Sequence, residues 1–409
     1  MIDRNNGQAV GVERGAVSGP LSGLRVVELT WVAMGPYAGH LLASLGAEVI
    51  QVGQLEPESV SAAPRWYDEL NIGKTCIGID VKSDEGLDLM KQLLIRADVF
   101  IENFRPGVVE RLGLSYEELS PTNPGLIMIS TAAVGRKRTD GNYAGYAPIF
   151  SALAGLAHLT GDSDAPPTEI RHPADLTGGA VAVLGILAGV ARRRKVGRGC
   201  YIDLSAREAV LWTLTAHFLG VQAGMETDSR RGNGHRWMAP HGVYRCKGEN
   251  CWISIAIGSD GEWEKLCAVM SQPDLRSNAR YAKSADRHLH RDELDRIIEM
   301  WTQDCESNEL TVKLQAAGVA AFPSSTNRDL WNSQHLQGRG IFERVDGRNR
   351  QRWIARAPWV FTGSTRRHPP TVLGMDAVTY VFGDLMGLPS DQIEALRVKR
   401  VIGPRGLGL

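Results

Sequence analysis

The sequence predicts an α/β protein that has a large, doubly wound domain and a second, smaller α+β domain. Strand-like runs alternate with helical segments over the first half of the chain, which is the order of βαβ units around a parallel sheet. A polar, loop-like stretch over residues 224–241 then breaks this alternation. The hairpin pattern and the helices that follow it favour a separate domain.

The first βαβ unit is the clearest. Residues 24–30 (LRVVELT) are rich in β-formers, residues 36–45 carry their leucines on one helical face, and residues 48–52 (EVIQV) make a second strand. The pattern then repeats along the chain. Further strands are expected at 76–80, 98–102, 126–130 and 201–204, and helices from 83 or 84 onward and at 150–160, 176–195 and 206–219.

The longest apolar stretch, residues 178–191, is followed by a basic run over 192–195. It is short and Gly-rich for a segment that crosses a bilayer. Because it is apolar around its whole circumference, we expect a helix that lies deep in the fold.

The second half of the chain has a different pattern. Residues 241–246 and 252–257 alternate in strand fashion around a Lys-Gly-Glu-Asn turn, and helices are expected near 260–270, 292–302 and 308–317. We interpret residues 225–330 as the smaller domain. Short strands over 352–361 and helices over 374–387 and 390–398 complete the sequence.

Charge and cysteine content exclude some classes of partner. Lys plus Arg and Asp plus Glu are each 46, so the net charge of zero predicts no general attraction to nucleic acid or to an anionic membrane. The six cysteines show no C-x-x-C spacing and are too few for a disulfide framework, which favours a reducing cytoplasm and no metal. Residues 1–19 contain no apolar core of a signal peptide.

The turn after the first strand argues against nucleotide cofactors. It contains a single glycine, Gly35, whereas a dinucleotide fingerprint needs several to let the backbone approach a pyrophosphate. NAD is therefore not expected. The sequence also lacks a Walker-type phosphate loop, so ATP is not expected either.

An anion site is expected at the end of the strand over 98–102. The run 103–107 (Asn-Phe-Arg-Pro-Gly) follows this strand, and Arg111 lies one helical turn later. Ligands bind at the carboxyl ends of strands in open α/β sheets. Arg105 and Arg111 can bind phosphate there, and the alternative is a pair of surface arginines beside a turn.

Asp175 directly precedes the most apolar helix of the chain, which begins with Gly178 and Gly179. One interpretation is an N-cap aspartate. The other is a nucleophile beside a close backbone approach that the glycines allow. His172 and the other loop histidines complete no catalytic triad by spacing. The residues themselves thus indicate an α/β protein with an anion site, without naming a reaction.

Seven segments stand together in one order along the chain: 20–53, 98–113, 145–161, 166–179, 197–208, 239–248 and 317–344. In this order they resemble the class III (CaiB/BaiF type) CoA-transferase family. The motifs TWVAMGP and GYAPIFSALAGLAHLTG resemble most the branch that contains succinyl-CoA:benzylsuccinate CoA-transferase subunits.

The resemblance implies an architecture and a set of partners. A Rossmann-like large domain would be formed by residues 20–222 and 335–409, with the small domain, 225–330, between them. Two such chains would interlock as a homodimer, or as a hetero-oligomer with a related chain. An acyl-CoA donor and a carboxylic-acid acceptor would be the substrates, so coenzyme A enters as substrate, without metal, ATP or NAD.

The resemblance also assigns residues to roles. The catalytic carboxylate falls on Asp175. A mobile lid falls near 236–242, with Met238, Pro240 and His241 as its substrate-facing residues. The residues expected to contact coenzyme A are Trp31, Val32, Ala33, Lys74, Asn103, Phe104, Arg105, Arg111 and Tyr146.

In the implied reaction, Asp175 attacks the donor thioester and carries the acyl group as an anhydride, then coenzyme A as an aspartyl thioester. Ala33 stands where formyl-CoA transferases carry glutamine, which argues against formate or oxalate and for a bulkier apolar or aromatic (di)carboxylic acid. The racemases of the family use a His near 145–148, and this chain has none there. A racemase or isomerase, and a non-catalytic partner subunit, are the alternatives.

Overall fold

The structure, a computed structural model, describes residues 19–55, 68–136, 147–170, 173–225, 230–346, 351–362 and 371–405. Two compact units divide the chain. The large unit consists of Met1–Leu156, Ile170–Leu219 and Gly340–Leu409, and the small unit of Ala157–Glu169 and Gly220–Arg339. The sequence predicts the smaller domain over 225–330, and did not anticipate that residues 157–169 belong with it.

A seven-stranded sheet is the centre of the large unit. Its order is β12-β3-β2-β1-β4-β5-β6, and every neighbouring pair is parallel except β12 and β3. The strand order therefore reverses between β1 and β4, as in doubly wound nucleotide-binding folds. The strands are β1 (Arg25–Leu29), β2 (Glu48–Gly53), β3 (Thr75–Ile79), β4 (Val99–Glu102), β5 (Ile127–Ala132), β6 (Cys200–Ser205) and β12 (Ile402–Pro404).

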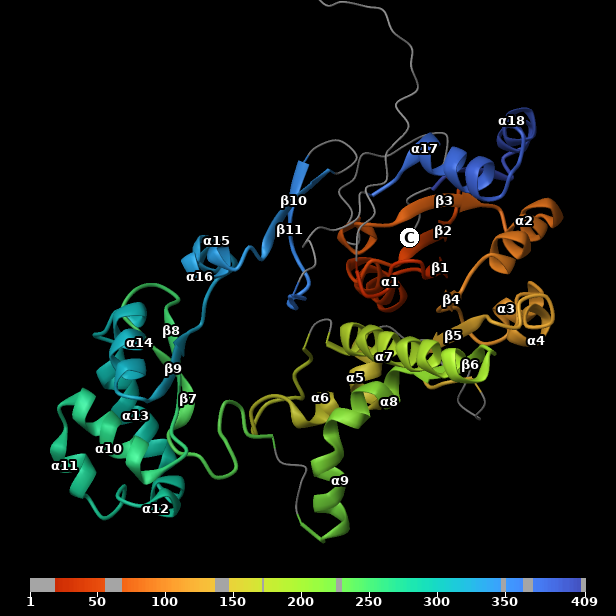
Figure 1. Cartoon of the computed structure of the whole chain (residues 1–409). Coiled ribbons are helices and arrows are strands. Elements are labelled where there is room, and N and C mark those ends of the chain that lie inside the picture. Colours follow the sequence, from red (N-terminus) through yellow and green to blue (C-terminus); the bar gives the residue numbers. More distant parts are fainter. Residues whose placement is uncertain are drawn as a thin grey trace, which may run out of the picture. The chain divides into compact units, whose positions relative to one another are not determined.

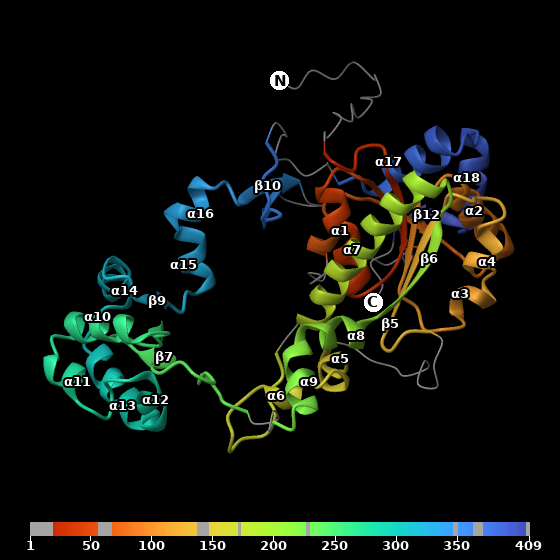
Figure 2. The same cartoon turned by 60° about the horizontal axis from the view of Figure 1, so that its bottom comes forward.

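Helices cover both faces of this sheet, as Figures 1 and 2 show. One face packs against α1 (Met34–Ser44), α5 (Ala147–Leu153), α7 (Pro173–Val196) and α8 (Ala206–Leu211). The other packs against α2 (Asp84–Ile95), α3 (Val108–Arg111), α4 (Tyr116–Leu119), α17 (Gly374–Val378), a π-helical segment (Thr379–Leu385) and α18 (Ser390–Val398).

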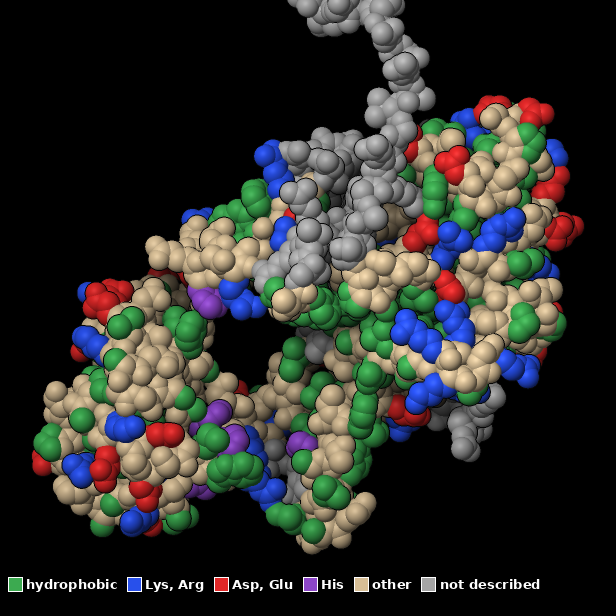
Figure 3. Space-filling view, in the orientation of Figure 1, with side chains coloured by type: hydrophobic (Ala, Val, Ile, Leu, Met, Phe, Trp, Pro, Cys, Tyr) green, Lys and Arg blue, Asp and Glu red, His purple; other side chains and the backbone are tan. Residues whose placement is uncertain are grey.

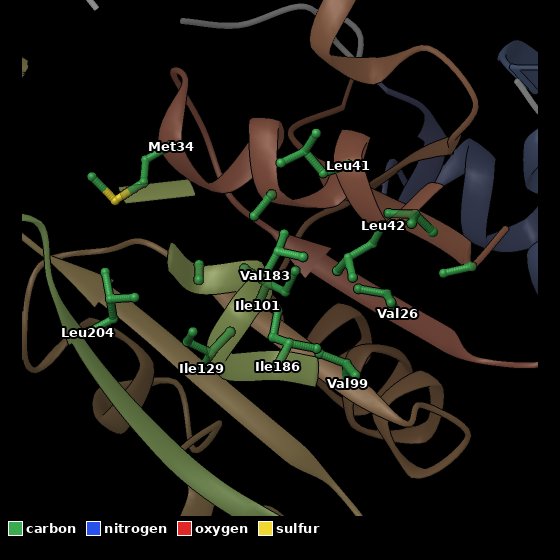
Figure 4. Close-up of a cluster of buried hydrophobic side chains, with 14 of the residues drawn as sticks. Val26, Met34, Leu41, Leu42, Val99, Ile101, Ile129, Val183, Ile186 and Leu204 are labelled. Carbon is green, nitrogen blue, oxygen red and sulfur yellow. The ribbon is translucent and has the colours of Figure 1, made fainter. Parts of the chain in front are cut away.

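The alternation of strand side chains explains the two layers. Val26 lies in the core of the α1 and α7 face, whereas its neighbour Val27 lies in the opposite core, and both are fully buried. Figure 4 shows Leu42 of α1 beside Val26 and Ile186 of α7 beside Val99 on the first face. Continuous apolar runs such as LRVV thus mark strands that are buried on both faces.

Helix α7 corrects one prediction. Its position agrees with the predicted helix at 176–195, but it does not lie deep in the fold, because Leu184 is 54% exposed and Val196 is 52% exposed. A helix on a sheet buries only the face that it turns toward the strands. Figure 3 shows hydrophobic side chains at the surface over α7 and over α9 (Thr215–Gln222).

By length and composition α7 could cross a membrane, since an 18-residue window within Ala174–Val196 has a mean hydropathy of 1.8. Half of that window is buried, and the helix packs on α1, β5 and β6. A half-buried core helix of a soluble protein passes the same test of length and composition, so this feature is weak evidence for a membrane.

The small unit packs helices on an antiparallel sheet of β7 (His241–Arg245), β8 (Trp252–Ala256) and β9 (Ala320–Pro323). The predicted hairpin is confirmed, whereas β9 was not predicted. Trp263, Leu266 and Ile298 are fully or almost fully buried in its core. The helices are α10 (Asp260–Met270), α11 (Pro273–Ser277), α12 (Ser284–Leu289), α13 (Arg291–Thr302), α14 (Ser307–Ala316), α15 (Asn327–Asn332) and α16 (Gln334–Gly338).

Two further elements complete the described chain. A two-stranded antiparallel ribbon joins β10 (Phe342–Asp346) to β11 (Gln351–Ala355), where the sequence predicts short strands near 352–361. A single helical turn, α6 (Leu156–Leu159), follows α5, so the helix predicted over 150–160 is broken in two. Gly155, at a φ of 84°, provides the left-handed residue at the break.

Candidate active site

A pocket of about 400 Å³ opens at the carboxyl ends of β1, β4 and β5 in the large unit. This is the point where the strand order reverses, and two strand-end loops diverge there to leave a crevice. Loops after these strands, the first turn of α7 and one residue of α5 form its wall. The lining residues are Trp31, Val32, Ala33, Met34, Asn103, Phe104, Arg105, Pro106, Val108, Thr131, Ala132, Ala133, Phe150 and Asp175.

The turn between β1 and α1 has an unusual backbone. Val32 adopts a φ of 64°, a left-handed conformation that a β-branched residue adopts only under strain. Asn103, on the loop after β4, forms hydrogen bonds with Trp31, the residue that precedes Val32. The Asn103 side chain accepts a hydrogen bond from the Trp31 N–H (3.0 Å) and donates one to the Trp31 carbonyl (2.7 Å). Asn103 thus lines the pocket while its amide ties two loops together.

A buried ion pair lies beneath this turn and corrects the expectation for Lys74. Lys74 and Glu28 are both 0% exposed, and the Lys74 Nζ donates to Glu28 Oε2 (2.7 Å) and to the Pro36 carbonyl (2.8 Å). Burial lowers the pKa of Lys74, and Glu28 opposes this effect. Lys74 therefore does not line the pocket, and it contacts α1 instead of presenting its charge to a ligand.

Helix α1 lies close to this ion pair because it has a glycine, Gly39, at the point of contact. A Cβ at Gly39 would lie 1.9 Å from Glu28 Oε2, so only glycine leaves room for the carboxylate. Thr30 Oγ1 donates to the other carboxylate oxygen at 2.6 Å. The pair thus joins β1, α1 and the segment before β3.

Asp175 lies in the first turn of α7 and is 7% exposed. It is the third residue of the helix, which begins at Pro173, and in this first turn the partial positive charge of the helix favours a carboxylate. Gly179 lets α7 approach α1, because a Cβ there would lie 2.8 Å from the Met34 carbonyl oxygen. Of the two glycines expected to allow a close backbone approach, Gly179 thus faces the backbone of α1, whereas Gly178 faces the side chain of Met34.

The two predicted arginines differ in position. Arg105 is exposed and lines the pocket, and it is the basic side chain among the described residues of its wall. Arg111 is exposed on α3 and is not part of that wall. Phe104 lines the pocket between Asn103 and Arg105. The loop after β4 therefore supplies a mixed apolar and cationic wall.

A second buried ion pair could not be predicted from the sequence, because no local pattern connects its two residues. Glu102, the last residue of β4, is fully buried, and Arg136 Nη2 donates to its Oε1 at 2.5 Å. Burial raises the pKa of Glu102 to about 7, and Arg136 opposes the rise. A basic residue after the strand over 126–130 is the only signal that the sequence carries for this contact.

The residues predicted for a lid lie in the small unit. Met238 and His241 line a second pocket, of about 290 Å³, beside α13, and the Ala239–Pro240 peptide bond is cis. His241 Nδ1 is 2.8 Å from the Asn233 carbonyl. Their action on the pocket of the large unit stays a prediction, and Tyr146 and His172 lie outside the described residues.

In the part of the chain that the structure describes, no group of three His, Cys, Asp or Glu side chains is arranged to hold a metal ion. The chemistry that the main pocket itself offers is a buried carboxylate, Asp175, beside an apolar wall and one guanidinium. Such a carboxylate can act as a nucleophile toward an activated acyl group.

Comparison with known proteins agrees with this chemistry. The chain is 32% identical to the succinyl-CoA–D-citramalate CoA-transferase of Chloroflexus aurantiacus, over 94% of this chain and 98% of that protein. It is 31% identical to the succinyl-CoA:mesaconate CoA-transferase of Haloarcula hispanica, over 83% and 89% respectively. A crystal structure of a CaiB/BaiF family protein from Brucella suis matches with a TM-score of 0.78 and 27% identity, covering 93% of this chain and 99% of that one.

The model of the CoA-transferase family III matches residues 21–377, which is most of the chain. The mixed α/β fold with its large parallel sheet agrees with the CaiB/BaiF structure. These observations support an enzyme that has CoA-transferase activity and uses coenzyme A thioesters. The chain therefore belongs to the CoA-transferase family III.

Proposed function

We propose that this enzyme moves coenzyme A from an acyl-CoA donor to a free carboxylic acid through covalent intermediates on Asp175. The observation that carries the proposal is the position of that carboxylate. Asp175 is 7% exposed, yet it lines the pocket at the carboxyl ends of the strands, together with the turn after β1 and the loop after β4. A nucleophile in this place is shielded from bulk water, which would otherwise hydrolyse an anhydride.

The exchange balances without an external energy source. A carboxylate oxygen of Asp175 attacks the thioester carbonyl, the C–S bond breaks, and coenzyme A leaves as a thiolate. The thiolate attacks the Asp175 carbonyl, which releases the donor acid and leaves an aspartyl thioester. The acceptor carboxylate then attacks this thioester and displaces the thiolate. Attack of the thiolate on the acceptor acyl carbon finally forms the new acyl-CoA and frees Asp175.

The pocket wall supports a substrate larger than formate. Trp31, Met34 and Phe150 supply apolar surface, and Arg105 supplies a positive charge for a second carboxylate. Relatives are named for succinyl-CoA as donor and for citramalate or mesaconate as acceptor. We therefore propose succinyl-CoA as the donor and a dicarboxylic acid as the acceptor. An aromatic dicarboxylic acid, as in the benzylsuccinate branch, is one candidate.

We propose further that the enzyme acts in the cytoplasm as an oligomer. Exposed apolar side chains on and near α9, such as Trp212 (64% exposed) and Leu219 (61% exposed), form the kind of surface that a second chain covers. One relative is named as the alpha subunit of a succinyl-CoA–L-malate CoA-transferase. A homodimer and a hetero-oligomer with a related chain both fit, and the mass of the purified particle separates them.

Mass spectrometry tests the covalent mechanism. The purified protein is mixed with a panel of acyl-CoAs and then with hydroxylamine, which traps an activated carboxyl group as a hydroxamate. We expect a hydroxamate on the peptide that contains Asp175, and the donor that labels it identifies one substrate. Asp175→Ala should abolish labelling and exchange while coenzyme A still binds. Asp164→Asn, a change at an exposed aspartate, is the matched control.

Other outcomes would favour the alternatives. Incorporation of solvent deuterium at the α-carbon of an acyl-CoA, without exchange of coenzyme A, would indicate a racemase. No label with any donor, together with coenzyme A binding, would indicate a non-catalytic subunit. Retained turnover in Asp175→Ala would overturn the proposed role of that residue.

A further inference from the structure

Residues 103–106 form one wall of the main pocket. Two residues that do not line the pocket, Glu102 and Arg136, form hydrogen bonds with this loop. Glu102 is the last residue of β4 and is 0% exposed. The Arg136 side chain, which follows β5 in the sequence, is 5% exposed. Both therefore lie under the 103–106 loop, in a place that a ligand in the pocket does not touch.

The pair holds the backbone of one loop residue, Phe104, at two points. Glu102 uses both oxygens: Oε1 accepts from Arg136 Nη2 (2.5 Å), and Oε2 accepts from the Phe104 N–H (3.0 Å). Arg136 Nη2 also lies 3.4 Å from the Phe104 carbonyl oxygen and donates to it. Phe104, the central residue of the wall, is thus bound at its N–H and at its C=O by one buried ion pair.

Arg136 is itself fixed to two other elements. Its Nη1 donates to Glu110 Oε1 on α3 at 2.7 Å. Its backbone N–H donates to both carboxylate oxygens of Asp203 on β6, each at 3.1 Å. The guanidinium therefore connects the end of β4 and the start of α3, while its own backbone is tied to β6. A planar guanidinium with several fixed donors suits such a junction.

We propose that Arg136, acting through Glu102, is a positioning residue that sets the conformation of the 103–106 wall for binding the coenzyme A thioester. The inference rests on the function proposed above. The physical reason is that a buried, hydrogen-bonded ion pair restrains its neighbours in direction as well as in distance. Removal of one partner leaves the other charge without compensation and releases the Phe104 peptide.

Titration of Glu102 gives a second way to perturb the pair. The groups that face or influence it are Arg136, Glu110, Ser130, and Tyr201 and Asp203 of β6. Burial raises the pKa of Glu102 to about 7. As the pH falls through that value, Glu102 becomes neutral and its bond to Arg136 loses the charge of one partner. We therefore expect the wild-type KM for the thioester to rise as the pH falls, and the KM of Glu102→Gln to lack that rise.

The experiment compares Arg136→Gln, Arg136→Lys and the control Arg194→Gln, which changes an exposed arginine at the far end of α7. Isothermal titration measures the affinity for coenzyme A, steady-state kinetics separates KM from kcat, and thermal unfolding reports folding. We expect Arg136→Gln to weaken coenzyme A binding and raise KM by about 10- to 100-fold, with a smaller change in kcat. Arg136→Lys should restore only part of the loss. It keeps the positive charge, but one ammonium cannot bridge all the acceptors.

The outcomes separate this inference from the function on which it rests. If the wild type binds coenzyme A and Arg136→Gln binds it equally well, the positioning role is wrong, even where the melting temperature falls. If the wild type binds no coenzyme A, the proposed function is wrong and this inference falls with it. Should Arg136→Gln not fold, Arg136→Lys and Glu102→Gln decide: an unchanged KM in the first and an unchanged pH profile in the second would refute the role.

Discussion

Replacement of Lys74 by methionine should destabilise the large unit strongly, although Lys74 touches no ligand in the main pocket. The change removes the positive partner of Glu28, and both side chains are 0% exposed. It also removes the donor to the Pro36 carbonyl at 2.8 Å. The Glu28 carboxylate then stays buried with the hydrogen bond from Thr30 Oγ1 but without the charge that balanced it.

The magnitude follows from burial. Breaking a buried ion pair by removing one partner typically costs about 3–5 kcal/mol, because the remaining charge stays out of water. This is a large fraction of the stability of a typical domain, about 5–15 kcal/mol. In Glu28→Gln/Lys74→Met the buried charge is gone and the amide still accepts from Thr30, so we expect most of the lost stability to return.

The measurement is urea unfolding, monitored by hydrogen–deuterium exchange of the β1 and α1 peptides. This probe reports on the large unit alone. Lys399→Met is the matched control, because Lys399 bonds Glu85 at 2.6 Å but both side chains are at least half exposed. An exposed pair contributes about 0–1 kcal/mol. An equal loss of stability in Lys74→Met and Lys399→Met would refute the reasoning, as would a double variant no more stable than Lys74→Met.

Three further predictions concern the same unit. Gly179→Ala should cost about 1–3 kcal/mol in urea unfolding, because its Cβ would lie 2.8 Å from the Met34 carbonyl; Gly185→Ala, whose Cβ meets nothing closer than 3.7 Å, should instead gain up to about 1 kcal/mol. Val32→Gly should raise the unfolding free energy by up to about 1 kcal/mol, since glycine adopts the φ of 64° without strain. Glu102→Gln should remove a pH dependence of unfolding: with a folded pKa of about 7 against 4.5, the wild type loses about 3 kcal/mol as the pH rises from 4.5 to 7.

Each of these has an outcome that would contradict it. Equal effects of alanine at Gly179 and Gly185 would mean that α1 and α7 are not in close contact. A loss of stability above about 1 kcal/mol in Val32→Gly would mean that packing of the valine outweighs its backbone strain. Parallel pH profiles of unfolding for the wild type and Glu102→Gln would show that Glu102 keeps its ordinary pKa in the folded protein.

Local patterns in the sequence determined much of the fold. Strands that are buried on both faces are continuous apolar runs, and βαβ order implies parallel pairing, so the first six strands of the sheet could be located to within about two residues. The same reasoning placed 103–107 at a strand end, and the structure brings this loop and Asp175 to one pocket. The role of Asp175 came from resemblance, because a first-turn aspartate has an ordinary structural function as well.

Tertiary structure alone decided the contacts that hold the site. Lys74 meets Glu28, 46 residues away, across an intervening strand, and Arg136, after β5, meets Glu102 of the neighbouring β4, 34 residues away. Hydrophobic periodicity reports which face of an element is apolar, but it carries no information on which distant polar group a buried charge will meet. Burial makes those partners obligatory, and only the folded sheet determines which residues they are.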